Sequence, residues 1–204
     1  MESPLERHLY SVSLEGDEPV RLTQGQGRWS VSVGSGGSGF IGTYSDVETP
    51  PSTALFAMDG ERIAWVEENP LDETHPYAPY LASHVMPQYG TIPAEDGTPL
   101  HYMMLKPKME PGKKYPVFIM HYGGPGPQMV DRGWKGALAQ AIVDKGYVYF
   151  VLDNRGSANR GVAFEQPIYH AMGGVEVRDQ KAGAEFLKSL DFVDPDKIAI
   201  YGWS

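Results

Sequence analysis

The sequence contains no cysteine among its 204 residues. This absence excludes disulfide bonds, zinc–thiolate sites and thiol catalysis. Basic residues are outnumbered, because 17 Lys and Arg stand against 26 Asp and Glu, and the formal net charge is −9. A surface that binds nucleic acid needs clustered Lys and Arg, so the charge balance argues against a nucleic-acid partner.

Long apolar runs are also missing. No stretch approaches the ~20 apolar residues that a membrane-spanning helix needs, so we expect no membrane segment. The first seven residues, Met1–Arg7, lack the apolar core that follows the positive charges of a signal peptide. What the chain does contain is 24 Gly, 17 Pro and 12 Tyr, a composition that favours strands joined by turns.

The first third of the chain alternates apolar and polar residues, as short antiparallel strands do. Strands are predicted over residues 8–14, 20–23, 29–33, 40–44, 55–58 and 62–66. This pattern suits a propeller blade, a sandwich or a barrel. A blade uses four strands in ~40–45 residues, so the region would hold fewer than two blades and a propeller would need more chain upstream.

Gly34–Gly39 has the glycine content of a phosphate-binding loop. No helix is predicted after it and no Lys completes the motif, so a hairpin turn between two strands is the better interpretation. Glu67-Glu68 at the end of this region is interpreted as a solvated acidic turn.

The pattern changes after a Pro-rich stretch at 69–79, which we interpret as a linker. A hairpin is predicted about Asp96-Gly97, and continuous apolar runs predict buried strands at 115–120, 147–152 and 197–201. Trp134, Leu138, Ala141 and Ile142 have helical spacing. A second helix is predicted from Val175 to Leu190, with Ala182, Phe186 and Leu190 on one face. Alternating strands and helices indicate an α/β parallel sheet.

Ser204 is the first candidate catalytic residue. Gly202-Trp203-Ser204 follows a predicted strand and supplies the first three places of G-x-S-x-G. Hydrolases mount a serine nucleophile on such a strand-to-helix turn, where a base and an oxyanion hole can reach it. Taken alone, the three residues would also fit an ordinary polar turn.

A second motif strengthens this interpretation. His121-Tyr122-Gly123-Gly124-Pro125-Gly126 follows the first predicted buried strand, where α/β-hydrolases carry an oxyanion-hole loop. Either the phenol of Tyr122 or the backbone N–H groups of Gly123 and Gly124 could donate to an oxyanion. A plain glycine turn is the alternative. His121 is interpreted as a packing residue at the end of the strand.

Together these motifs resemble the prolyl oligopeptidase family of serine peptidases, and most closely its dipeptidyl peptidase IV branch. The resemblance is carried by "RHLYSV", "YPVFIMHYGGPGPQ", "VLDNRGSANRG" and "GGVEVRDQKAGAEFLKSLDFVDPDKIAIYGWS". It covers essentially the whole chain. It implies a β-propeller followed by an α/β-hydrolase domain. Residues 1–70 would be the last strands of the propeller, 71–87 a linker, and 88–204 the opening part of the hydrolase domain.

On that resemblance Ser204 matches the nucleophile and Tyr122 the tyrosine that stabilises the oxyanion. Asp153, Arg155, Gly156 and Ser157 match a D-x-R-G-S turn that we interpret as architectural. The triad acid and base would follow Ser204 in the chain, because all six His residues precede it.

The activity that the resemblance implies is release of Xaa-Pro or Xaa-Ala dipeptides from peptides with a free N-terminus. It implies no metal and no organic cofactor, a homodimer, and a periplasmic or secreted location. An acyl-peptide hydrolase or esterase of the same fold is one alternative. The other is that the 204 residues alone form an inert piece, because they lack the Asp and His of the triad.

Overall fold

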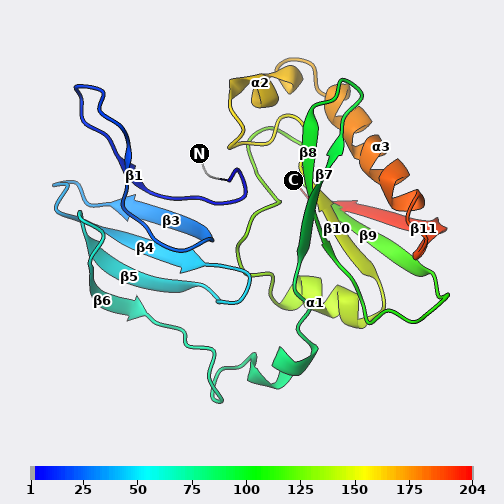
Figure 1. Ribbon diagram of the computed structural model, residues 1–204, viewed down its shortest axis with the longest axis horizontal. Helices are drawn as coiled ribbons and strands as arrows, with labels where there is room; N and C mark the ends of the chain where they lie inside the picture. The colour runs from blue at the N-terminus through cyan, green and yellow to red at the C-terminus, as the bar shows by residue number, and fades with distance from the viewer. Residues whose placement is uncertain (1–2, 204) are drawn as a thin grey trace. The chain divides into compact units, whose positions relative to one another are not determined.

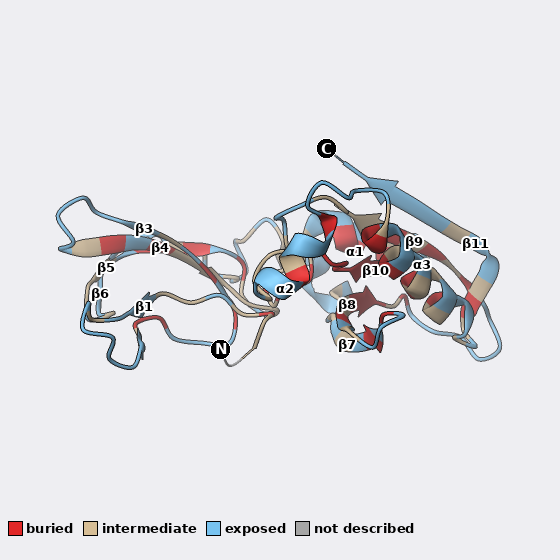
Figure 2. Ribbon diagram, turned by 90° about the horizontal axis from the view of Figure 1, so that it is seen from above, coloured by how far each residue is buried: buried red, intermediate tan, exposed pale blue. Residues whose placement is uncertain are grey.

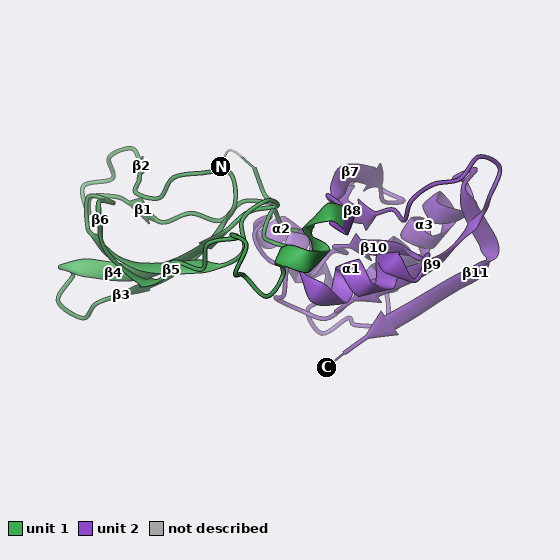
Figure 3. Cartoon of the chain, turned by 90° about the horizontal axis from the view of Figure 1, so that it is seen from below, with its two compact units in different colours: residues 1–82, 131–134 green, residues 83–130, 135–204 purple. Residues whose placement is uncertain are grey.

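The chain divides into two units in this computed structural model, which describes residues 3–203 (Figure 3). The first unit is formed by the described residues of 1–82 together with 131–134. The second is formed by 83–130 together with the described residues of 135–204.

Antiparallel strands build the first unit (Figure 1). Its four-stranded sheet contains β3 (Arg28–Val33), β4 (Gly39–Ser45), β5 (Ser52–Ala57) and β6 (Arg62–Glu67), in that order. A separate two-stranded pair contains β1 (Tyr10–Ser11) and β2 (Val20–Arg21). The predicted strands are therefore confirmed, although only two residues of the segment 8–14 pair.

Aromatic side chains form the centre of this first sheet. The rings of Phe40 and Phe56 stack with centroids 5.0 Å apart, and Trp29 meets Phe56 edge-on at 5.4 Å. Gly42 is required beneath Trp29, because a Cβ there would lie 2.9 Å from Trp29 Cζ3. The Gly34–Gly39 segment joins β3 to β4, which confirms that it is a hairpin turn.

Trp134 lies outside the helix in which the sequence pattern places it. The helix α1 begins only at Ala137, after Gly136 at its N-cap. Trp134 instead belongs to the first unit, where its ring meets that of Tyr77 edge-on at 5.4 Å. The apolar spacing was misleading because this Trp packs against an aromatic ring that is distant in sequence.

A five-stranded mixed sheet forms the second unit, in the order β11-β9-β10-β8-β7. The strands are β7 (Gln88–Pro93), β8 (Pro99–Leu105), β9 (Tyr115–His121), β10 (Val148–Leu152) and β11 (Val193–Gly202). β9, β10 and β11 run parallel, as predicted, while β7 and β8 form the antiparallel hairpin about Asp96-Gly97. The sheet is therefore α/β in type with an antiparallel hairpin at one side.

Two longer helices cross over between the parallel strands. α1 (Ala137–Asp144) joins β9 to β10, and α3 (Val175–Lys188) joins β10 to β11. The two crossovers run in opposite directions along the sheet, and right-handed connections then place α1 and α3 on opposite faces (Figure 1). Three short helical segments were not predicted: η1 (Ala78–Ser83), α2 (Val162–Glu165) and η2 (Gln166–Ile168).

Buried residues concentrate in β8, β9 and β10, the inner strands of the sheet (Figure 2). Leu100, Val117, Val148 and Phe150 are completely covered. All five residues of β10 are buried, as expected of a strand covered on both faces. No helix of the described residues is long and apolar enough to cross a bilayer.

β11 is not the buried strand that its apolar run predicts. It forms one edge of the sheet, and its only neighbour in the described chain is β9. Ile200 and Tyr201 are 57% and 45% exposed. The apolar residues are present, but no further strand of the described chain pairs with this edge.

The buried face of α3 is wider than the predicted one. Its most buried positions include Asp179, Gly183 and Leu187, whereas Ala182 and Phe186 are only half-buried. Asp179 is 1% exposed because it forms an ion pair. Phe186 and Leu190 do pack against the core, so the predicted face is confirmed in part. The buried stripe also includes Asp179, and a buried carboxylate is not detected by apolar periodicity.

Candidate active site

Ser204 lies outside the described residues, but the strand that leads to it is described. β11 ends at Gly202, and parallel pairing sets Gly202 opposite His121, the last residue of β9. The carboxyl ends of the two strands therefore meet at one edge of the sheet. Tyr122 follows β9 immediately at this edge, so the two predicted motifs are brought together there.

His121 determines the residues that fit around it. A Cβ on Gly123 would lie 3.0 Å from His121 Nδ1, and a Cβ on Gly202 would lie 2.9 Å from His121 Nε2. Gly123 also has φ +83°, a conformation that favours glycine. The imidazole thus fills the space between the loop after β9 and the end of β11.

The imidazole of His121 is suited to packing rather than to proton transfer. Its Nδ1 is buried, and no residue in the described part of the chain accepts or donates a hydrogen bond there. Burial lowers the pKa of His121 below its ordinary value, so the ring is neutral near pH 7. These observations support its interpretation as a packing residue.

Tyr122 is half-buried and its ring lies against the loop that follows it. A Cβ on Gly124 would lie 3.2 Å from Tyr122 Cε1, so the glycine leaves room for the phenol ring. No metal-binding group of three His, Cys, Asp or Glu side chains occurs within residues 3–203.

The D-N-R-G-S turn after β10 holds this loop in place. Asn154 Nδ2 donates to the carbonyl of Gly123 at 3.2 Å. Gly126 N donates to the carbonyl of Gly156 at 3.0 Å, and Ala158 N donates back to Gly126 O at 2.9 Å. The loop that carries Tyr122 is therefore tied to the segment that follows β10 by three hydrogen bonds.

Asp153 fixes the far end of the same loop. Its carboxylate is 1% exposed and accepts hydrogen bonds from the backbone N–H groups of Met129 and Val130. Arg160 neutralises it, with Nη2 at 3.1 Å from Oδ2. The buried charge thus serves to anchor backbone, which agrees with the architectural role predicted for the turn.

Arg155 connects the turn to α3. Its guanidinium donates to both carboxylate oxygens of Asp179, at 3.0 Å from Nε and 2.7 Å from Nη2, and it also pairs with Asp96. These carboxylates raise the pKa of Arg155 further above its ordinary value. Sequence reasoning singled out Arg155 but missed Asp179, whose only signal was its place in the first half of a helix.

Glu67 and Glu68 lie in the first unit at the end of β6 and are exposed. Glu67 Oε1 accepts a hydrogen bond from the backbone N–H of Asn69 at 3.3 Å. This environment agrees with a solvated acidic turn.

Two family models match the chain. The model of the dipeptidyl peptidase IV N-terminal region matches residues 1–51, and that of the prolyl oligopeptidase family matches 134–204. Dipeptidyl peptidase 8 of Mus musculus is 34% identical over 216 residues, which cover 100% of this chain and 24% of that protein. The chain belongs to the prolyl oligopeptidase family, in its dipeptidyl peptidase IV branch.

Solved structures of this branch agree. Dipeptidyl peptidase 4 of Porphyromonas gingivalis superposes with a TM-score of 0.85 at 27% identity, covering 99% of this chain and 28% of that one. A putative dipeptidyl aminopeptidase IV from Bacteroides ovatus superposes with a TM-score of 0.69 at 38% identity. The match covers 86% of this chain and 25% of that one. The chain thus spans about a quarter of the length of these family members.

Proposed function

We propose that a polypeptide containing this chain is a serine peptidase that releases Xaa-Pro or Xaa-Ala dipeptides from peptide N-termini. The observation that carries the proposal is the pairing of Gly202 with His121, which brings the strand leading to Ser204 beside the strand end that carries Tyr122. The names of dipeptidyl peptidase 8 and dipeptidyl peptidase 4, two of the proteins that the chain resembles, support the same activity.

The strand order supports a hydrolase domain that begins in the second unit. Strands β7 to β11 lie in the order 5-3-4-2-1 when numbered from β7, with a serine motif at the end of the fifth. We assign residues 88–204 to the opening part of an α/β-hydrolase domain, 71–87 to a linker, and 1–70 to the last strands of a β-propeller. The four-stranded antiparallel sheet β3–β6 has the strand number of one blade.

In the proposed reaction Ser204 Oγ attacks the carbonyl carbon of the second residue of the substrate. The hydroxyl proton passes to a His from sequence beyond residue 204 and then to the leaving amine, while an Asp orients that His. The Tyr122 phenol donates a hydrogen bond to the oxyanion. Water then attacks the acyl-enzyme ester and releases the dipeptide.

The surroundings of Tyr122 suit this role. Asn154 restrains the carbonyl of Gly123, so the loop is held before any substrate arrives. A donor that is already oriented costs little reorganisation when charge develops on the substrate oxygen. By family resemblance we also propose a homodimer in the periplasm or outside the cell.

The test uses a polypeptide that extends this chain to the length of its relatives. Gly-Pro and Ala-Pro chromogenic amides should be cleaved, and N-acetylated versions of the same amides should not. Ser204→Ala should abolish cleavage, and Tyr122→Phe should lower kcat by about 10²–10³. Preferential cleavage of the N-acetylated compounds would instead favour an acyl-peptide hydrolase. The 204-residue chain by itself is expected to be inactive.

A further inference from the structure

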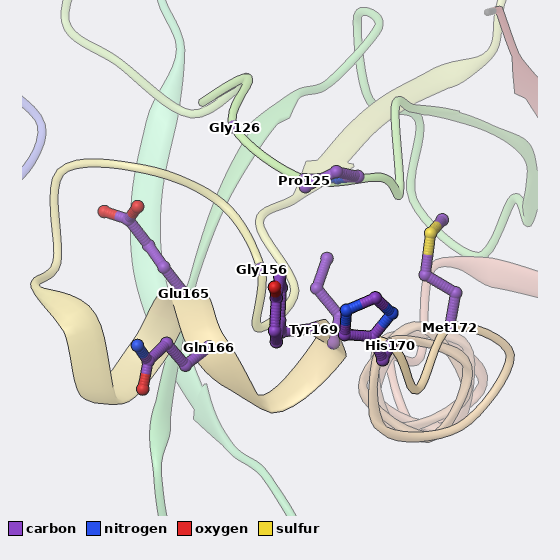
Figure 4. Close-up of a pocket in the computed structure, with 9 residues that line it drawn as sticks. Pro125, Gly126, Gly156, Glu165, Gln166, Tyr169, His170 and Met172 are labelled. Carbon is purple, nitrogen blue, oxygen red and sulfur yellow. The ribbon is translucent and has the colours of Figure 1, made fainter.

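A cavity of about 700 Å³ lies in the second unit, beside the loop that carries Tyr122 (Figure 4). One wall is formed by the backbone of Gly126 and Gly156, at the carboxyl ends of β9 and β10. The opposite wall is formed by the segment after α2, with Tyr169, His170 and Met172. The cavity is therefore built from the same loops that position the candidate oxyanion donor.

The backbone of this region has conformations that only glycine adopts readily. Gly126 and Gly156 have φ values of +96° and +103°, which favour glycine. A Cβ on Gly156 would lie 2.8 Å from Ile168 Cγ1, so this glycine allows the segment after α2 to approach. His170 has φ +51°, which is uncommon for a residue with a side chain. Such conformations persist where surrounding structure imposes them, and they often mark binding sites.

The rim of the cavity exposes large apolar side chains to solvent. Tyr169 is 74% exposed and Met172 is 64% exposed. Exposed apolar side chains that gather around a concavity are typical of a ligand-binding site. The titratable groups of the lining are few, with Glu165 at one end and His170 near the centre (Figure 4). The cavity is thus suited to an uncharged, apolar group.

Met172 connects the cavity to the candidate active site. A Cβ on Gly124 would lie 3.2 Å from Tyr122 Cε1 and 3.9 Å from Met172 Cε. The phenol ring and the thioether methyl therefore both border the same glycine. A peptide whose carbonyl reaches Tyr122 would have a neighbouring residue within reach of the cavity.

We propose that this cavity binds an apolar or aromatic side chain of the peptide that departs when the dipeptide is released. This inference rests on the proposed dipeptidyl peptidase activity. The acyl side of such a substrate has only two residues, and its free N-terminus must be enclosed. The departing side continues into solvent, which matches an open cavity with exposed walls. In the strand order β11-β9-β10, β9 lies between two strands. On one side is β10, whose following turn forms a wall of the cavity, and on the other is β11, which leads to Ser204.

The test compares two peptides in the extended polypeptide, both beginning Gly-Pro and differing only in the third residue, Phe or Gly. The wild type should favour Phe, and Tyr169→Ala and Met172→Ala should each lower the Phe/Gly ratio of kcat/KM by about tenfold. Val162→Ala is the matched control, because Val162 is also 64% exposed but does not line the cavity. It should leave the ratio unchanged.

An unchanged ratio in both variants would overturn the inference while leaving the proposed function intact. The inference would also be overturned if the two variants changed the preference for the second residue of the substrate, before the cleaved bond, and not the preference for the third. Binding is measured in parallel by titrating the departing peptide, Phe-Ala-Ala, into the Ser204→Ala protein and following amide NMR signals. If the amide signals of residues 165–172 shift, and if these shifts are smaller in Tyr169→Ala, the cavity binds the departing peptide. This result would support the inference even if no Gly-Pro compound is cleaved. No shifts there would overturn it even if cleavage occurs.

Discussion

Arg155 and Asp179 form a buried, two-pronged ion pair between the turn after β10 and helix α3. Asp179 also accepts a hydrogen bond from the backbone N–H of Arg155 at 2.9 Å. One carboxylate therefore holds both the side chain and the main chain of the turn. Because the same turn is hydrogen-bonded to the loop that carries Tyr122, the ion pair helps to hold that loop in position.

Replacing Asp179 by Asn should reduce the free energy of unfolding of the second unit by about 3–5 kcal/mol, because it removes the buried counter-charge of Arg155 and leaves only the half-exposed Asp96. Urea denaturation followed by circular dichroism measures this. Glu185→Gln is the control, since Glu185 pairs with Lys188 on the exposed side of the same helix, and no measurable change is expected. Equal effects of the two substitutions would contradict the structural role assigned to Asp179.

Gly123 and Gly112 allow backbone strain to be separated from contact with His121. Both have positive φ, +83° and +74°, but nothing lies within 4 Å of a Cβ on Gly112. Each Ala substitution should cost about 1–2 kcal/mol through the left-handed backbone. Gly123→Ala should cost at least about 1 kcal/mol more, because the new methyl group overpacks the imidazole. Thermal or urea unfolding of the two variants checks the difference, and equal losses would show that His121 moves aside freely.

Acid should destabilise the second unit through its histidines. Burial lowers the pKa of His84, His101 and His121 below the ordinary value of about 6.5. The unfolded chain therefore takes up protons below pH 6.5 that the folded chain does not. The free energy of unfolding should stay level above about pH 7 and fall as pH drops through 6.5 toward the folded pKa values.

His121→Gln isolates one of these contributions. Removing one titrating group should make the fall with acid shallower, by at most about 1.4 kcal/mol per pH unit. Urea midpoints measured between about pH 5 and 8 give the slopes. Curves that run parallel for the variant and the wild type would mean that the folded state protonates His121 as readily as the unfolded state does.

The edge strand β11 should make the 204-residue chain self-associate. An unpaired edge with exposed apolar residues is a template for pairing with another chain. Ile200→Lys should lower the apparent mass in sedimentation or light scattering at high protein concentration. Leu138→Lys is the control, because Leu138 is 63% exposed on helix α1 rather than on a strand edge. A monomer at all concentrations, or equal effects of both changes, would argue against edge pairing.

The elements that the sequence predicted well are those in which one signal dominates. β10 is a continuous apolar run and all five of its residues are buried, as expected. β9 forms where its apolar run predicts, but buried and half-buried residues alternate along it. The hairpins about Asp96-Gly97 and within 34–39 have turn residues that leave few alternatives. In these elements the local composition and the final burial favour the same structure, so the sequence alone is enough to predict them.

The predictions that failed depend on partners distant in sequence. Trp134 has helical spacing but packs on Tyr77, and Asp179 is buried because Arg155 neutralises it. The exposure of β11 reflects which elements cover it, which its own residues do not specify. The short α2 and η2 segments contain too few residues for a period to be detected.

For the candidate site, the sequence identified the two motifs. The structure showed which residues of β9 and β11 lie opposite each other. Gly202-Trp203-Ser204 and the loop of Tyr122 were both recognised from spacing. The place of Gly202 beside His121, the residue before Tyr122, follows only from the pairing of β11 with β9 rather than with β10. The cavity next to Tyr122 had no signal in the sequence, because its walls come from three separate segments.

The central claim is that Ser204 is a nucleophile assisted by the phenol of Tyr122. The most direct measurement is labelling of the extended polypeptide with a fluorophosphonate, followed by mass spectrometry to locate the adduct. We predict a single adduct on Ser204, formed about 10²–10³ times more slowly in Tyr122→Phe. A folded protein in which Ser204 stays unlabelled, or in which Tyr122→Phe reacts at the wild-type rate, would contradict the account.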